Sequence, residues 1–217
     1  MKILLPLFPL NLVAFPGEQL NLHIFEPRYR QLVNECYENN KTFGIPPVKE
    51  GQPLLLGTEM KIVEISKAYE DGKLDIKTVG LNAFKLLDFK TKAPDKLYPI
   101  GEVSLIEDDP ASDIVLAGRV LKLIRELYEI MRMKNEVPEL SNDFQINSIA
   151  HKIGLNFDQE IELLQINSEE ERLSYVESHL LRLIPIVGEM ELLRKKVQMN
   201  GHFKNVIPPD LREIDPE

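Results

Sequence analysis

The sequence predicts an α+β protein in which a small β-barrel is followed by an α-helical bundle. Up to about Pro110, short apolar runs alternate with turn signals, which is typical of β-strands in a small sheet. Beyond Pro110, apolar residues recur at helical spacing. Most prolines lie at or before this point, as expected because proline is excluded from helix interiors. We therefore expect a barrel subdomain over 1–110 and a helical subdomain over 111–217.

The first part is predicted to hold about six short strands and one inserted helix, which would allow a closed or half-closed barrel without exposed edges. The helix is expected to begin at Pro27, because proline suits the first helical turn, and to end near Asn39. Asp71 and Gly72 form a strong hairpin signal between two strands. The expected strands cover 2–5, 20–24, 43–45, 54–65, 74–79, 83–89 and 99–106.

The second part is predicted to be helical. Ser112 or Asp113 can cap a helix that runs to about Lys134, and shorter helices are expected at 147–154 and 157–164. A longer helix should follow Ser168, and Pro185 must kink or break it. The residues after this helix are rich in proline and acidic side chains, and they are expected to form a loose tail.

Composition disfavours nucleic-acid and membrane partners. The chain has 217 residues and a formal net charge of −9, whereas phosphate binding depends on Lys and Arg. Prolines interrupt the apolar N-terminus, and no stretch approaches the roughly 18 apolar residues of a membrane span. The single cysteine, Cys36, cannot form an internal disulfide, which fits a reducing compartment. We expect a cytoplasmic protein.

No local motif indicates catalysis, a cofactor or a metal. The sequence contains no complete P-loop, no GxGxxG, no GxSxG and no HExxH. Cys36 lies on the apolar stripe of its predicted helix, which favours packing over nucleophilic chemistry. Asp108 and Asp109 precede Pro110, where acidic residues more often form a turn and cap than a cation site. We expect a protein that is not an enzyme, although a constellation assembled only by folding stays open.

The segment PLFPLNLVAFPGEQLNLHIFEPRYRQLVNECYENNKTFGI resembles the opening of the Lon protease N-terminal substrate-binding domain. An LFPL run is followed by FPG, by an apolar strand leading into HIFEPRYR, and then by FG. VGLNAFKL, with Gly80 and Phe84, continues the similarity, and the helical part matches more loosely. The resemblance implies a PUA-like barrel followed by a helical bundle. The ATPase and Ser-Lys protease modules of Lon are not found, so we expect a stand-alone domain.

This resemblance implies binding of unfolded or exposed apolar polypeptide segments, with a role as an adaptor or regulator of proteolysis. A groove between barrel and bundle is expected to take an extended chain by apolar burial and strand addition. A scaffold role explains the motif residues at least as well. The candidate peptide-binding residues are Phe8, Phe15, Pro16, Phe25, Glu26, Arg28 and Tyr29.

Three alternatives stay open at this point. RNA binding is suggested by the PUA-like barrel, although the net charge opposes it. An enzyme on the same scaffold would need a cleft of perturbed ionisable groups. The apolar stripes at 114–131 and 173–197 would pair between chains in a structural oligomer, but packing within one chain is favoured. We expect a monomer or weak dimer.

Overall fold

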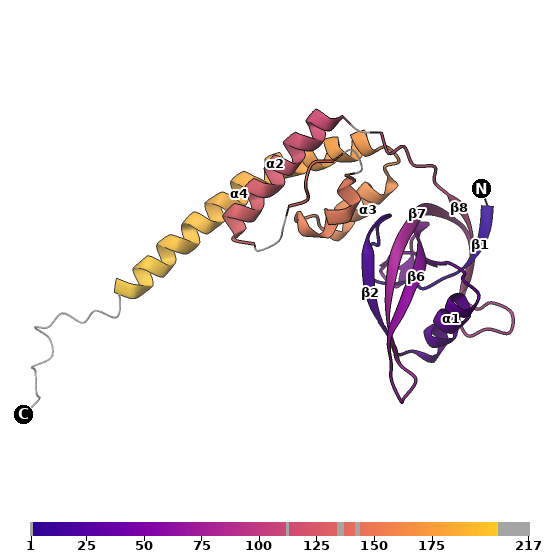
Figure 1. Ribbon diagram of the computed structural model, residues 1–217. Coiled ribbons are helices and arrows are strands. Elements are labelled where there is room, and N and C mark those ends of the chain that lie inside the picture. Colours follow the sequence, from indigo (N-terminus) through magenta and orange to yellow (C-terminus); the bar gives the residue numbers. More distant parts are fainter. Residues whose placement is uncertain (1, 112, 134–136, 142–143, 204–217) are drawn as a thin grey trace, which may run out of the picture.

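The computed structural model describes residues 2–111, 113–133, 137–141 and 144–203, without the side chains of 199–203. A curved antiparallel sheet with one helix occupies one end of the molecule, and the later helices occupy the other (Figure 1). The predicted α+β class and the order of its two parts are therefore confirmed. The expected acidic tail, at 204–217, lies outside the described residues.

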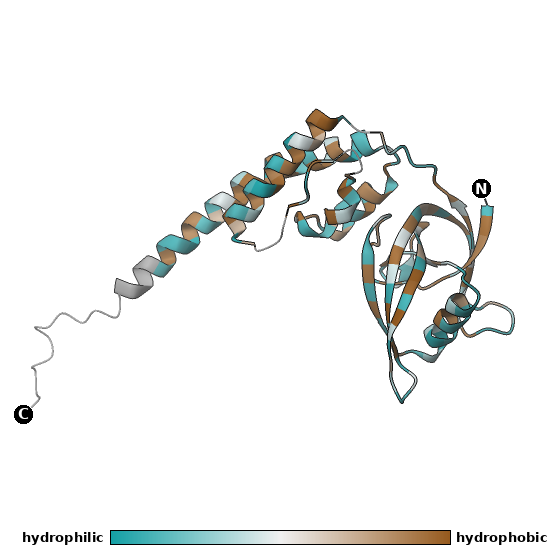
Figure 2. Cartoon of the chain, viewed as in Figure 1, coloured by the Kyte–Doolittle hydropathy of each residue, from teal (hydrophilic) through white to brown (hydrophobic). Residues whose placement is uncertain are grey.

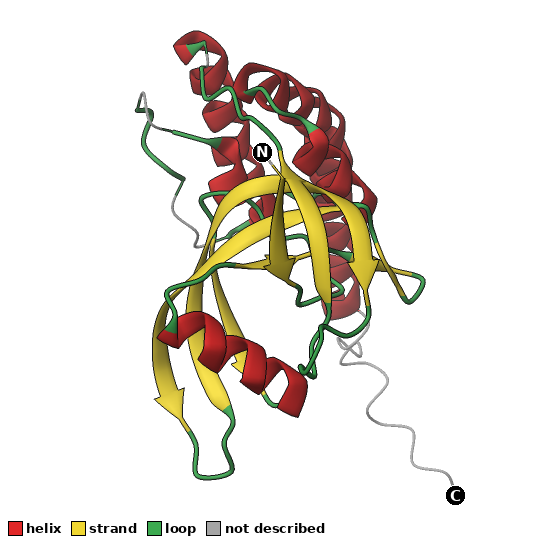
Figure 3. Ribbon diagram, turned by 90° about the vertical axis from the view of Figure 1, so that its right-hand side faces the viewer, coloured by secondary structure: helices red, strands yellow, loops and turns green. Residues whose placement is uncertain are grey.

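The sheet is six-stranded, with the order β1-β8-β7-β6-β3, and β2 pairs with β7. A separate hairpin joins β4 and β5. The strands are β1 (Lys2–Pro6), β2 (Gln19–Ile24), β3 (Phe43–Ile45), β4 (Val48–Lys49), β5 (Gln52–Pro53), β6 (Leu56–Ala68), β7 (Leu74–Lys90) and β8 (Ile100–Leu105). Figure 3 shows how strongly the sheet curves, with helix α1 (Pro27–Glu38) below it.

The two edges of the curved sheet approach each other beside β3. The residue after β1, Leu7, forms a parallel bridge with Gly44, and the Phe8 N–H donates to the Gly44 carbonyl at 2.8 Å. A second parallel bridge joins Leu10 to Pro47. These bridges are isolated and do not form a continuous ladder, so closure of the barrel stays a prediction.

Strand β7 differs from the expectation of two separate strands. It runs unbroken through Gly80 over 17 residues. A Cβ added at Gly80 would lie 2.1 Å from the carbonyl oxygen of Phe15. The glycine therefore permits a close backbone approach within one continuous strand, where the sequence predicts separate strands over 74–79 and 83–89.

The helical part consists of α2 (Ile114–Met131), the 3-10 helix η1 (Ile146–Lys152), α3 (Phe157–Gln165) and α4 (Glu169–Phe203). Asp113 caps α2 by accepting a hydrogen bond from the Val115 N–H at 2.8 Å. The stripes of α2 and α4 pack on each other within the chain, burying residues such as Ile124 and Leu173. Packing within one chain, favoured from the sequence, is confirmed for this part of the two helices.

Pro185 does not break α4, so the expectation of a break is wrong. The helix continues from Glu169 to Phe203 with the proline inside it (Figure 1). Proline removes the N–H that would bond to the carbonyl of Leu181. Leu181 is 58% exposed, so water can satisfy that carbonyl.

The two parts of the molecule share a hydrophobic core. Val13 and Phe15, from the segment between β1 and β2, are both 0% exposed and belong to the cluster formed by the helices. The change from strand to helix falls between Leu105 and Ile114, and the division into subdomains at 110/111 stays a prediction. Among the helices in the described part of the chain, none is long and apolar enough to span a membrane.

Candidate functional site

A cavity of about 460 Å³ lies where the sheet meets the helices. It is open to solvent on one side and is walled by both parts of the chain. We call it the junction cavity. Its lining residues are Pro16, Gly17, Gly80, Leu81, Asn82, Ala83, Ile106, Asp108, Gln145, Asn147, Leu164, Ile166, Asn167 and Arg172.

One wall of the junction cavity is a short gap in the pairing of β7. On the same edge, β7 pairs with β2 up to Val79 and with β8 from Phe84 onward. The flanking carbonyls are used, since Gly80 accepts from the Gly17 N–H at 3.0 Å and Ala83 accepts from the Ile106 N–H at 2.8 Å. Within the described residues, neither β2 nor β8 pairs with Leu81 and Asn82. A short strand edge therefore faces the cavity.

The cavity also offers apolar surface and one unmatched polar atom. The Leu81 side chain is 38% exposed at the gap. Asn147 is 4% exposed. Its Oδ1 accepts no hydrogen bond from the residues that the structure describes. A buried acceptor without a donor is uncommon in folded proteins. A ligand N–H entering the cavity would satisfy it.

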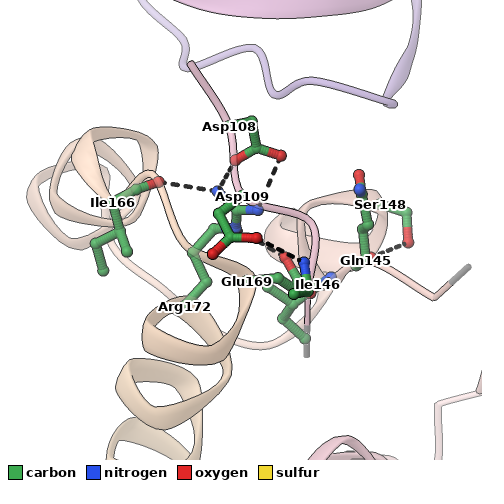
Figure 4. Close-up of polar contacts among 9 residues, drawn as sticks. Asp108, Asp109, Gln145, Ile146, Ser148, Ile166, Glu169 and Arg172 are labelled. Atoms are coloured by element: carbon green, nitrogen blue, oxygen red, sulfur yellow. Dashed lines mark hydrogen bonds and ion pairs between the residues drawn. The ribbon is translucent and has the colours of Figure 1, made fainter. Parts of the chain in front are cut away.

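An ion cluster around the buried Arg172 holds the helical wall in place (Figure 4). The Arg172 side chain is 3% exposed, and it pairs with Asp108 at 2.7 Å and with Glu169 at 2.8 Å. Arg172 also donates to the Ile166 carbonyl at 2.9 Å. Glu169 in turn accepts from the Ile146 N–H at 2.6 Å. The cluster thus ties the segment after β8, the α3–α4 turn and η1 to one guanidinium.

Burial and pairing oppose each other in this cluster. Burial raises the pKa of Glu169, despite hydrogen bonds from Ile146 and Arg172 that lower it. Burial of Arg172 would lower its pKa, but Asp108 and Glu169 raise it overall, so the guanidinium is charged. Glu169 is fully buried at the start of α4, and Arg172 compensates its carboxylate.

A second polar cluster, outside the lining of the junction cavity, joins the two parts of the chain. His151 of η1 contacts Glu18 at 3.2 Å through Nε2 and Glu160 at 2.7 Å through Nδ1. Glu18 also accepts from the Phe15 N–H at 3.0 Å. The hydrogen bond to Glu18 outweighs burial and raises the pKa of His151 to about 9. His151 is therefore an imidazolium at neutral pH, held between two carboxylates.

Three of the predicted site residues are buried in the core, and their role in peptide binding stays a prediction. Phe8 and Tyr29 are 6% and 4% exposed, and their ring centroids lie 3.9 Å apart in the core beneath α1. Phe15 is fully buried in the helical cluster. These rings fix the scaffold and do not line the cavity, because burying large aromatic surface outweighs leaving it at a groove wall.

Of the other predicted residues, Pro16 lines the junction cavity, and Phe25, Glu26 and Arg28 lie elsewhere. Phe25 is 59% exposed beyond the far end of β2, roughly 20 Å of strand away from Gln19. Glu26 pairs with Arg28 at 2.8 Å. Arg30 donates to the Asp71 carbonyl at 2.8 Å.

Sequence reasoning missed most of the cavity wall. Asn147 and Arg172 carry no local motif, and they reach the site only because η1 and α4 fold onto the sheet. The available signals were Gly80 within VGLNAFKL and the paired acids at Asp108. Neither signal alone points to a cavity.

Cys36 is 2% exposed, and burial raises the pKa of its thiol to about 11, which suits the packing role expected from the sequence. Among the described residues, no group of His, Cys, Asp and Glu is placed to hold a metal ion.

A curved antiparallel sheet with a helix, followed by helices, is the fold of Lon N-terminal domains. The structure is similar to that of a Lon N-terminal domain protein from Xanthomonas campestris, with a TM-score of 0.65 and 27% identity over 81% of this chain and 98% of that one. It also shares the fold of the N-terminal domain of Mycobacterium avium complex Lon protease, with a TM-score of 0.60 and 18% identity over 82% of this chain and 98% of that one.

The sequence itself defines the family. The model of the ATP-dependent protease La (LON) substrate-binding domain matches residues 4–182. The chain therefore belongs to the Lon substrate-binding domain family, as its opening motif indicated. Neither an ATPase domain nor a protease domain is detected within the 217 residues.

Proposed function

We propose that this protein binds unfolded or exposed apolar polypeptide segments in the junction cavity and does not catalyse a reaction. The observation that carries the proposal is the unpaired edge of β7 at Leu81 and Asn82, inside a cavity of about 460 Å³. Family membership supports the class of ligand.

The geometry suits an extended chain of undefined sequence. Main-chain hydrogen bonds to a strand edge give affinity whatever the ligand side chains are. Leu81 supplies apolar contact beside that edge, and Asn147 offers its unmatched acceptor. Such recognition selects for backbone that is not already paired, which is a property of unfolded protein. A folded protein has few such groups to offer.

The same site supports a role in proteolysis. A domain that holds exposed segments would act as an adaptor that delivers clients to a protease, or as a regulator that competes with one. The charge pattern disfavours RNA, since the one cation among the described residues that line the cavity, Arg172, is already paired with Asp108, and the chain carries a net −9.

The proposal is tested by titrating a fluorescent, permanently unfolded polypeptide with the full chain, with a folded protein and a single-stranded RNA in parallel. We expect saturable binding to the unfolded chain alone, and the binding should survive raised salt because apolar burial is not screened. Leu81→Glu should weaken binding about tenfold or more, since it places a charge at the strand edge.

Leu97→Glu is the matched control. Leu97 is also an exposed leucine, at 53%, but its backbone N–H bonds to Gln31 of α1, away from the cavity. Equal effects of the two variants would place binding elsewhere. Phe25→Ala in the same titration tests the exposed Phe25, Glu26 and Arg28 surface, which stays a predicted second contact. Binding to RNA instead of the unfolded chain would replace the proposal.

A further inference from the structure

The distal part of α4 carries an exposed apolar face. We define the distal stripe as Ile186, Met190, Leu193 and Val197, which are 56%, 63%, 60% and 71% exposed. Figure 1 shows this part of α4 extending beyond the end of α2 and away from the rest of the molecule. Apolar residues continue along it in Figure 2. Exposed apolar surface of this kind marks interaction sites.

The distal stripe continues a helix face that is covered earlier in α4. Tyr175 contacts Glu162 of α3 at 2.8 Å, and His179 contacts the Ile153 carbonyl at 3.1 Å. Leu183 packs beside Gly154. The α3–η1 hairpin therefore covers this face as far as Leu183. Past that point, the described residues leave it open.

The spacing of the distal stripe fits a helical partner of the same kind. Its members recur at intervals of four, three and four residues, which is the a/d pattern of a coiled-coil seam. Helix α2 does not use this seam, because α4 meets α2 through another face that includes Leu180 and Ile184. One seam is thus left for a second helix.

The charges beside the seam are self-complementary. When two copies of the distal stripe run antiparallel, Met190 lies opposite Leu193 of the second copy and Ile186 lies opposite Val197. That register places Glu189 opposite Lys196 of the second copy, and the symmetry repeats this pair. On the other flank Val187 faces Arg194, so no like charges meet.

We propose that two copies of this chain associate through their distal stripes as an antiparallel helix pair. A parallel pair would bring both α3–η1 hairpins to the same level on the shared face, where they collide. The antiparallel arrangement places each hairpin past the C-terminal end of the other stripe. The overlapping stripe from Ile186 to Val197 is roughly 17 Å long, and in this register each hairpin begins at the level of position 200 of the other copy. This inference is independent of the proposed peptide binding.

Charge reversal on the full chain tests the pairing. Sedimentation equilibrium should show a monomer–dimer equilibrium in the micromolar range. Glu189→Lys or Lys196→Glu alone should weaken the dimer roughly 3- to 10-fold, because each places like charges opposite each other twice. The double variant should recover the dimer. Glu189 and Lys196 lie too far apart along one helix, about 10 Å, to pair within a chain.

Disulfide trapping tests the direction. Ile186→Cys and Val197→Cys chains should form a mixed disulfide when combined, and neither should form one alone. The native Cys36 is buried, and the unsubstituted chain is the background control. Circular dichroism verifies that the variants, all at exposed positions, keep their helices.

Three results would overturn the proposal. One is a monomer at every soluble concentration, which would leave residues 204–217 or another protein as the occupant of the stripe. Another is a dimer that Met190→Glu and the charge reversals leave intact. The last is efficient trapping of Ile186→Cys or Val197→Cys with itself, which indicates a parallel pair.

Discussion

His151 joins the sheet to the helices through a charge. Its ring lies between the carboxylates of Glu18 and Glu160, and its side chain is 34% exposed. Because hydrogen bonding to Glu18 raises the pKa to about 9, the folded protein keeps a proton that the unfolded chain releases near pH 6.5. The stabilisation is fully present below pH 6.5 and is lost as the pH rises through about 9.

We predict that the free energy of unfolding falls by about 1 kcal/mol between pH 6.5 and 9, after allowing for solvent screening of this partly exposed group. Urea denaturation at several pH values measures it. His151→Gln should remove most of this slope. His179 serves as an internal contrast, because burial lowers its pKa. Its contribution to the free energy of unfolding is therefore lost as the pH falls, not as it rises. An unchanged slope in His151→Gln would contradict the assignment.

At the level of elements, Pro185 shows that a proline can be accommodated inside a helix. The sequence predicts a kink or a break at this proline, and α4 is not broken there. The missing hydrogen bond falls at Leu181, a residue on the exposed side of α4. The neighbouring Ile184 packs in the cluster that includes α2, which stabilises the helical conformation at this point.

We predict that Pro185→Ala raises the free energy of unfolding by about 1 kcal/mol or more, because it restores a backbone hydrogen bond and a favourable helix former. Chemical denaturation followed by circular dichroism measures the change. Ser178→Ala, at another exposed site on α4, controls for helix propensity alone. A destabilised Pro185→Ala would mean that the proline fixes the direction of the helix.

On the scale of the whole molecule, the sheet and the helices depend on each other. Val13 and Phe15, in the segment between β1 and β2, pack in the helical cluster. Arg172 and His151, from the helical part, pair with Asp108 and Glu18. The salt bridge between Lys49 and Asp158 adds a contact at the surface. The junction cavity exists only because both parts are present.

We predict that a fragment of residues 1–110 folds poorly by itself. It would expose Val13 and Phe15, each of which contributes about 1.5 to 3 kcal/mol when buried. Circular dichroism and the dispersion of amide signals in NMR spectra measure its order. Adding the fragment of residues 111–217 in trans should restore signal dispersion. A well-folded 1–110 fragment would instead support two independent subdomains.

The sequence by itself determined the family, the α+β class and the position of nearly every element, because periodicity and turn chemistry are local properties. It also assigned Cys36 to the core. The tertiary structure alone decided which aromatic rings are buried and where the junction cavity opens. It also decided where the pairing partner of β7 changes from β2 to β8. Those features depend on contacts between residues such as Asp108 and Arg172 that are distant in the chain, and no local pattern records such contacts.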